Sequence, residues 1–158
     1  GPAGVWQLFA AGKADAMAAV PDWIVSATQA GAKVKVFSSD EYFKSMAQAI
    51  LVSDETIQKR PELVKKLVRA TLKGMQDIMK DPAAAARDYA NAVPQHKGKE
   101  ASVEAVFKLY NTYVYPGQKV LGAMDPDRLA AVQKFYVKEG IVAKETPIAE
   151  LYTNQFVQ

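Results

Sequence analysis

The sequence predicts an α/β beginning followed by a mostly helical remainder. Residues 14–20 form a short apolar run of small side chains, which is typical of a buried strand. Residues 33–37 alternate between charged and apolar side chains with the period of a strand. After residue 54 the apolar residues recur every three or four positions, as they do in amphipathic helices. These three observations predict strands in the first third of the chain and helices in the rest.

The first third is predicted as a β-α-β unit. A helix that stops at Gly12 precedes the first strand, and a second helix runs from Pro21 to Gly31 before the second strand. Residues 47–52 are a third strand candidate, and Ser53 or Asp54 caps the helix that follows. Because parallel sheets are normally buried on both faces, we expect these strands to join a sheet completed by other strands.

The rest of the chain is predicted as helices, and most of them begin at a proline. Aspartate precedes two of these prolines and can cap the helix, because its carboxylate accepts hydrogen bonds from the first backbone N–H groups. The helices are predicted over residues 61–80, 82–93, 100–113, 126–139 and 147–152.

Composition excludes several classes of site. The 158 residues contain no cysteine, which rules out disulfides, thiolate zinc sites and cysteine nucleophiles. No apolar run approaches the ~20 residues that a membrane-spanning helix needs. The net charge is +3, and Lys65, Lys66, Arg69 and Lys73 share one helical face. No aromatic residues lie among them, so a solvated helix face is favoured over a nucleic-acid site, and no nucleic-acid partner is predicted.

The candidate binding residues are Ala19, Val20, Pro21, Asp22 and Trp23, where the first strand ends and a helix begins. Small molecules bind at such strand ends in α/β folds. The aromatic ring can stack on a ligand, and backbone N–H groups at the helix start can hold an anion. The alternative is that Trp23 packs in the core and Asp22 only favours the helix start. A carboxylate here suits an amine or a zwitterion better than a sulfonate.

Other chemistry-bearing residues have plainer interpretations. His96 is the only histidine and is predicted to be exposed, since no acidic residue lies close to it in sequence. Tyr110, Tyr113 and Tyr115 straddle a helix end, which favours helix packing over carbohydrate stacking. No phosphate-binding loop, paired histidines or serine elbow occurs, so no catalytic residue, metal site or cofactor is predicted.

Four stretches of the chain together resemble the NMT1/THI5-like family of solute-binding proteins. This group includes binding proteins for nitrate, sulfonates, taurine and thiamine precursors. The matching stretches cover nearly the whole chain and occur in the family's order: Ala-Gly-Lys-Ala-Asp-Ala at 11–16 with Val-Pro-Asp-Trp at 20–23, residues 50–55 with 60–64, residues 122–126 leading to 140–142, and residues 150–156.

The resemblance implies part of a type II periplasmic-binding-protein fold, in which two lobes with parallel sheets close on a solute about a hinge. Residues 1–45 would complete the second, ligand-binding lobe, and residues 46–54 would form a hinge strand. Residues 55–158 would be helices packed on the first lobe, and the N-terminal part of the fold would lie outside this chain. Tyr42 would line the mouth of the cleft beside the hinge, and the alternative, which the residues favour, is plain packing.

The resemblance also implies a function. An extracytoplasmic binding protein of an ABC importer would capture a small organic anion or zwitterion and deliver it to the permease and ATPase subunits. Such a protein would be periplasmic, or extracellular with a lipid anchor at the missing N-terminus. Three alternatives remain: a ligand-sensing domain of a signalling protein, a pyrimidine-synthase-like enzyme, and a module that pairs with a separately encoded front half. The enzyme branch relies on histidine and a cysteine-rich motif, whereas this chain has one histidine and no cysteine.

Overall fold

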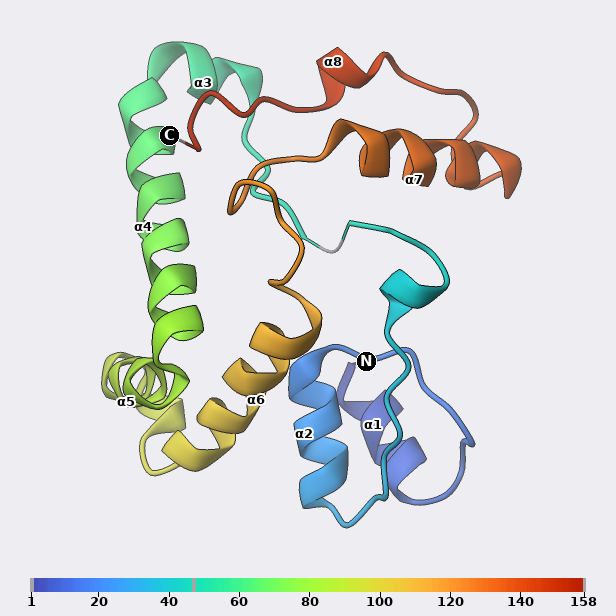
Figure 1. The fold of residues 1–158 in the computed structure, drawn as a ribbon, viewed down its shortest axis with the longest axis vertical. Coiled ribbons are helices and arrows are strands. Elements are labelled where there is room, and N and C mark those ends of the chain that lie inside the picture. The colour runs from blue at the N-terminus through green and yellow to red at the C-terminus, as the bar shows by residue number, and fades with distance from the viewer. Residues whose placement is uncertain (1, 47, 158) are drawn as a thin grey trace. The chain divides into compact units, whose positions relative to one another are not determined.

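The computed structural model describes residues 2–46 and 48–157. Its regular elements are helices (Figure 1), and no strand occurs in these two ranges. The elements are α1 (Pro2–Ala10), α2 (Pro21–Gln29), η1 (Ser39–Glu41), α3 (Asp54–Lys59), α4 (Pro61–Lys80), α5 (Pro82–Ala92), η2 (Pro94–His96), α6 (Glu100–Tyr113), α7 (Pro126–Lys138) and α8 (Ile148–Leu151).

Local side-chain chemistry explains where several helices begin. The Asp81 carboxylate accepts a hydrogen bond from the backbone N–H of Ala84 at 2.9 Å at the start of α5. Asp125 accepts in the same way from the N–H of Asp127 at 2.9 Å at the start of α7, and Ser53 caps α3. These caps satisfy N–H groups that have no partner within the helix. The predicted helix starts at Pro21, Pro61, Pro82 and Pro126 are confirmed.

The predicted strands do not form in the structure. Residues 14–20, 33–37 and 48–52 have no regular secondary structure, and residue 47 lies outside the described residues. A strand is held by a backbone ladder to its neighbour, and no ladder joins these segments in the part of the chain that is described. Leu51 remains 92% exposed and Phe37 61%. The α/β prediction is therefore not confirmed, and residues 48–53 of the predicted hinge strand are irregular chain that leads into α3.

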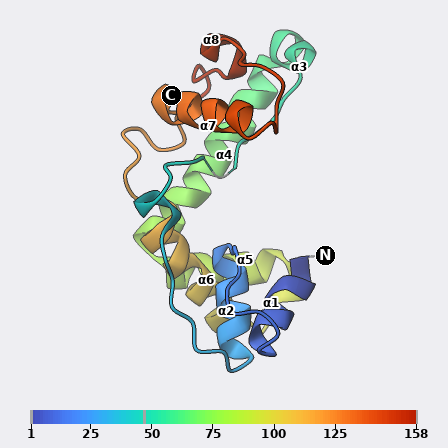
Figure 2. The same ribbon diagram turned by 90° about the vertical axis from the view of Figure 1, so that its right-hand side faces the viewer.

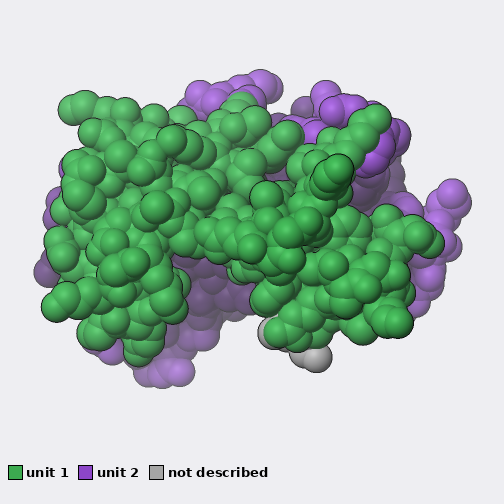
Figure 3. All heavy atoms as spheres, turned by 90° about the horizontal axis from the view of Figure 1, so that it is seen from below, with its two compact units in different colours: residues 1–36, 74–116 green, residues 37–73, 117–158 purple. Residues whose placement is uncertain are grey.

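The chain divides into two compact units (Figure 3). Unit 1 contains residues 1–36 and 74–116, and unit 2 contains residues 37–73 and 117–158. The boundary between residues 73 and 74 falls within α4. The predicted assignment of residues to a lobe, a hinge and a helical part concerns a larger fold and stays a prediction.

Unit 1 is a set of helices packed through small side chains. α2 packs against both α1 and α6, and α5 packs against α6 (Figures 1 and 2). Gln29 of α2 donates a hydrogen bond to Ser102 of α6 at 3.1 Å. No buried side chain is larger than valine among the described residues. The buried residues of unit 1 include Val25, Ala27, Ala86, Ala90 and Val103.

Unit 2 uses side-chain amides to hold irregular chain in place. Asn154 accepts from the backbone N–H of Met124 at 2.8 Å and donates to its C=O at 3.1 Å. Gln133 of α7 likewise accepts a hydrogen bond from the backbone N–H of Thr146 at 2.7 Å and donates one to its C=O at 2.9 Å. Each amide thereby satisfies a backbone donor and acceptor that a strand neighbour would satisfy in a sheet. α4 contributes the buried Val64, which is 3% exposed.

Candidate ligand-binding site

The five residues predicted to bind a ligand lie together at the start of α2 in unit 1. Pro21 is the first helical residue and is buried, whereas Ala19 and Asp22 are exposed and Trp23 is half-buried. The C=O of Val20 accepts a hydrogen bond from the backbone N–H of Trp23 at 3.0 Å, and no side chain caps the helix. A carboxylate and an aromatic ring therefore stand side by side in sequence at an uncapped helix start.

Two tyrosines of unit 1 lie in α6 and in the turn after it, and the first of them, Tyr110, is near Asp22. The rings of Tyr110 and Tyr115 have centroids 5.5 Å apart. Burial raises the pKa of the Tyr110 hydroxyl above its ordinary value, and the negative charge of Asp22 raises it further. Burial also raises the pKa of Tyr115, with a smaller contribution from Tyr110. The Asp22 carboxylate is thus close enough to Tyr110 for its charge to act on that hydroxyl.

Sequence reasoning assigned this tyrosine cluster to helix packing and did not connect it with Asp22. The close spacing of Tyr110 and Tyr115 in the sequence was a visible signal of an aromatic pair. Its proximity to Asp22 depends on the packing of α2 against α6, which no local pattern encodes. The structure therefore extends the candidate site to Asp22, Trp23, Tyr110 and Tyr115.

Tyr42, the sixth predicted binding residue, belongs to unit 2. It ends η1 and its side chain is 73% exposed. Such exposure suits a residue at the mouth of a cleft and equally a solvated loop. Its part in the same site as the α2 residues stays a prediction.

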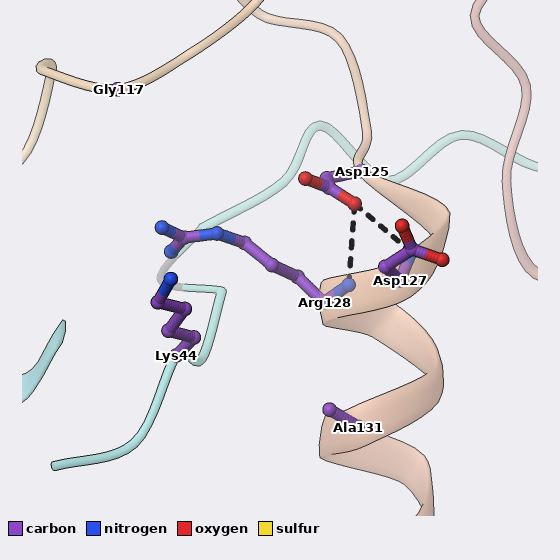
Figure 4. Close-up of a pocket in the computed structure, with 6 residues that line it drawn as sticks. All are labelled: Lys44, Gly117, Asp125, Asp127, Arg128 and Ala131. Carbon is purple, nitrogen blue, oxygen red and sulfur yellow. Dashed lines mark hydrogen bonds between the residues drawn. The ribbon is translucent and has the colours of Figure 1, made fainter.

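Unit 2 has a hollow of about 340 Å³ at the start of α7 (Figure 4). Lys44 and Arg128 bring two positively charged side chains to its lining. The Asp125 carboxylate is occupied with capping α7 and is hydrogen-bonded to two backbone N–H groups. The hollow is lined by Lys44, Gly117, Asp125, Asp127, Arg128 and Ala131. No sequence motif indicated this hollow, because its residues come from separate segments.

Arg128 joins α7 to the loop around η1. Its Nη2 lies 2.7 Å and its Nη1 3.1 Å from the two carboxylate oxygens of Asp40. Nη1 also donates to the backbone C=O of Ser45 at 3.1 Å. Two-pronged contacts of this kind fix orientation as well as charge. The guanidinium is thus already paired, which makes it a structural element of unit 2 rather than an open anion site.

We expect the pair of Asp40 and Arg128 to stabilise the fold at neutral pH and not in strong acid. The hydrogen bond from Arg128 holds the pKa of the Asp40 carboxyl below its usual range. A carboxyl with a lowered folded-state pKa adds stability above its unfolded pKa of about 3.9. That stability is lost as the pH falls through the pKa that the carboxyl has in the folded state. Because the Asp40 side chain is 48% exposed, solvent screening limits the contribution to about 0.5–1 kcal/mol.

Urea unfolding of Asp40→Asn measures this contribution. The variant should be less stable than the unaltered chain at neutral pH and equal to it in strong acid, where both side chains are uncharged. An equal loss of stability at both pH values would show that the ion pair is not the source.

His96 lies against a tyrosine ring. His96 is half-buried rather than exposed as predicted, because its ring lies 5.1 Å from the ring of Tyr89. In residues 2–46 and 48–157 no three side chains of histidine, cysteine, aspartate or glutamate gather where they could hold a metal ion. None of the helices described has both the length and the apolar character needed to cross a membrane.

Comparison with known proteins identifies the family of the chain. The model described as "NMT1/THI5 like" matches residues 2–85, more than half of the chain and including the start of α2. The riboflavin-binding protein RibY of Chloroflexus aurantiacus is 25% identical over 131 residues, which cover 80% of this chain. The chain spans 37% of the length of that relative. No solved structure matches. By its family match, which implies a periplasmic-binding fold, the chain belongs to the NMT1/THI5-like family.

Proposed function

We propose that this chain is part of an extracytoplasmic solute-binding protein that captures a small molecule and delivers it to an ABC importer. Membership of the NMT1/THI5-like family and the similarity to a riboflavin-binding protein support the capture of a small solute. Delivery to a permease and its ATPase, and a periplasmic location, are further parts of the proposal. The function consists of binding and release, with no bond made or broken.

The observation that carries the ligand class is the Asp22 carboxylate beside aromatic rings at the start of α2. Asp22 forms no ion pair in the described residues, so its negative charge is not neutralised by the protein. A sulfonate or nitrate ion would be repelled there. Trp23 and Tyr110 offer ring faces on which a planar heterocycle can stack. We therefore propose an uncharged or zwitterionic heterocycle, of the pyrimidine or flavin type, as the ligand.

Ligand-dependent thermal unfolding of the full-length gene product tests this proposal. The panel contains riboflavin, pyrimidines, taurine, an alkyl sulfonate, nitrate and amino acids. A ligand at about a hundred times its Kd adds roughly 2.7 kcal/mol, which raises Tm by several degrees. A shift with riboflavin or a pyrimidine is the expected result. A shift with taurine, sulfonate or nitrate alone would overturn the ligand class, and no shift with any solute would overturn the function.

Replacing Trp23 with alanine should weaken binding of the panel's positive ligand about tenfold, because the loss of one stacked ring costs about 1–3 kcal/mol. Trp23→Phe should retain most of the affinity, since it keeps an aromatic face. The matched control is Trp6→Ala, which removes the other tryptophan of the chain from α1. Fluorescence or calorimetric titration at a temperature where all variants are folded gives the Kd values. Equal losses of affinity in Trp23→Ala and Trp6→Ala would show that Trp23 is not part of the binding site.

A further inference from the structure

The positive charge of this chain is concentrated in one segment of unit 2. Residues 59–73 contain six lysines and arginines and a single acidic residue, Glu62, for a net charge of +5. The whole chain carries only +3. Outside this segment, therefore, acidic residues outnumber basic ones, and the overall charge understates how basic this region is.

Helical geometry gathers four of these cations on one side of α4. At 100° per residue, Lys65, Lys66, Arg69 and Lys73 lie within an arc of about 100°, and they extend over about 12 Å of the helix axis. We call these four residues the α4 basic surface. All four are exposed.

The other side of α4 anchors the helix to unit 2. Val64 is 3% exposed, and Val68 and Leu72 are half-buried at four-residue steps after it. A Cβ atom at Gly122 would contact the Leu72 side chain, which places this side of α4 against the loop before α7. The α4 basic surface therefore takes no part in the packing of unit 2.

Three cations of the surface are not neutralised within the described residues. Lys65, Lys66 and Arg69 form no ion pair there, in contrast to Lys59, which lies 2.7 Å from Glu55. Unpaired cations in one row create a local positive potential, which attracts an anionic partner.

We propose that the α4 basic surface docks on the anionic headgroups of a phospholipid bilayer. Leu63 and Leu67 are 45% and 50% exposed, and Leu63 lies one turn from Lys66 on the neighbouring flank of the helix. A basic face bordered by exposed leucines is the pattern of helices that lie at a membrane interface. Each cation near an anionic bilayer surface adds attraction that does not depend on a fixed geometry.

The same features argue against a protein partner or a nucleic acid. Protein interfaces depend on buried aromatic or arginine anchors, and α4 carries no aromatic residue. Single-stranded nucleic acids are bound by aromatic rings between the cations, which this surface also lacks. A plane of anionic headgroups can bind a row of long, flexible cations, and such binding requires no aromatic side chain.

Cosedimentation of the full-length gene product with vesicles tests the proposal. The vesicles contain phosphatidylglycerol and phosphatidylcholine in equal parts, or phosphatidylcholine alone, at low ionic strength. The triple variant Lys65→Gln, Lys66→Gln, Arg69→Gln removes three charges from the surface. The matched control, Lys134→Gln, Lys138→Gln, Lys144→Gln, removes three charges from exposed positions elsewhere in unit 2. Circular dichroism confirms that both variants are folded.

The expected result is binding to the phosphatidylglycerol vesicles that decreases with added salt and is absent with phosphatidylcholine. The surface variant should bind about 100-fold more weakly, since each lost cation lowers binding roughly fivefold. The control variant should bind within about fivefold of the unaltered chain. The proposal is overturned if the unaltered chain does not bind the vesicles at low salt, or if the two variants lose the same amount of vesicle affinity. Binding to soluble polyglutamate but not to vesicles would also overturn it, in favour of an acidic protein.

Discussion

Replacing Ala86 with leucine should lower the free energy of unfolding by about 3 kcal/mol, at the upper end of the cost of overpacking. Ala86 lies in α5, which packs against α6, and it is only 1% exposed. Ala90, one turn later, is equally buried, so the adjoining turn has no free space for the added atoms. The leucine must either move the helices apart or adopt a strained rotamer. Urea unfolding followed by circular dichroism and tryptophan fluorescence measures the loss, since Trp6 and Trp23 both belong to unit 1.

The control for this substitution is Ala101→Leu in α6. Ala101 is exposed, so the same added atoms remain in solvent. Its stability should stay within about 0.5 kcal/mol of the unaltered chain. If both leucine variants lost the same stability, the buried contact of α5 with α6 would not be the cause.

Replacing Gly122 with valine should also cost about 3 kcal/mol, because two penalties act together. Gly122 has a φ of 80°, a left-handed conformation that costs a residue with a side chain about 1–2 kcal/mol. A Cβ atom there would also clash with the end of the Leu72 side chain of α4, which must leave its preferred rotamer at a cost of about 0.5–1.5 kcal/mol. Urea unfolding of the variant gives the total.

Gly117→Val separates the two penalties. Gly117 has a φ of 81°, yet a Cβ atom there would have no neighbour within 4 Å. This variant should therefore show the backbone cost alone. Adding Leu72→Ala to Gly122→Val should cost less than the two single effects predict, because the clash is then removed. Additive effects in this double-mutant cycle would mean that Leu72 and Gly122 do not interact.

Helix boundaries were predictable from the sequence because their causes are local. An aspartate before a proline caps a helix through backbone N–H groups two or three residues away, as Asp81 and Asp125 do. No distant contact is needed for such a start. The strands failed for the opposite reason: residues 33–37 have a strand-like pattern, but a strand forms only when a second segment completes its ladder.

The candidate site also has one part that follows from the local sequence and one part that does not. The position of Asp22 and Trp23 at a helix start follows from the proline between Val20 and Asp22, and sequence reasoning found it. The tyrosine pair near Asp22 was missed as part of this site, because Tyr110 is remote in sequence and reaches it only through the packing of α2 on α6.

The amino-acid pattern alone thus specified the NMT1/THI5-like family, the helix starts and the concentration of charge on α4. Only the folded structure shows which residues are buried. Within α5, Ala86 is 1% exposed whereas Ala92 is exposed, although the two side chains are identical. The pairing of Asp40 with Arg128, 88 residues apart, likewise has no local signature. Caps act over two or three residues, whereas burial and ion pairing depend on the path of the whole chain.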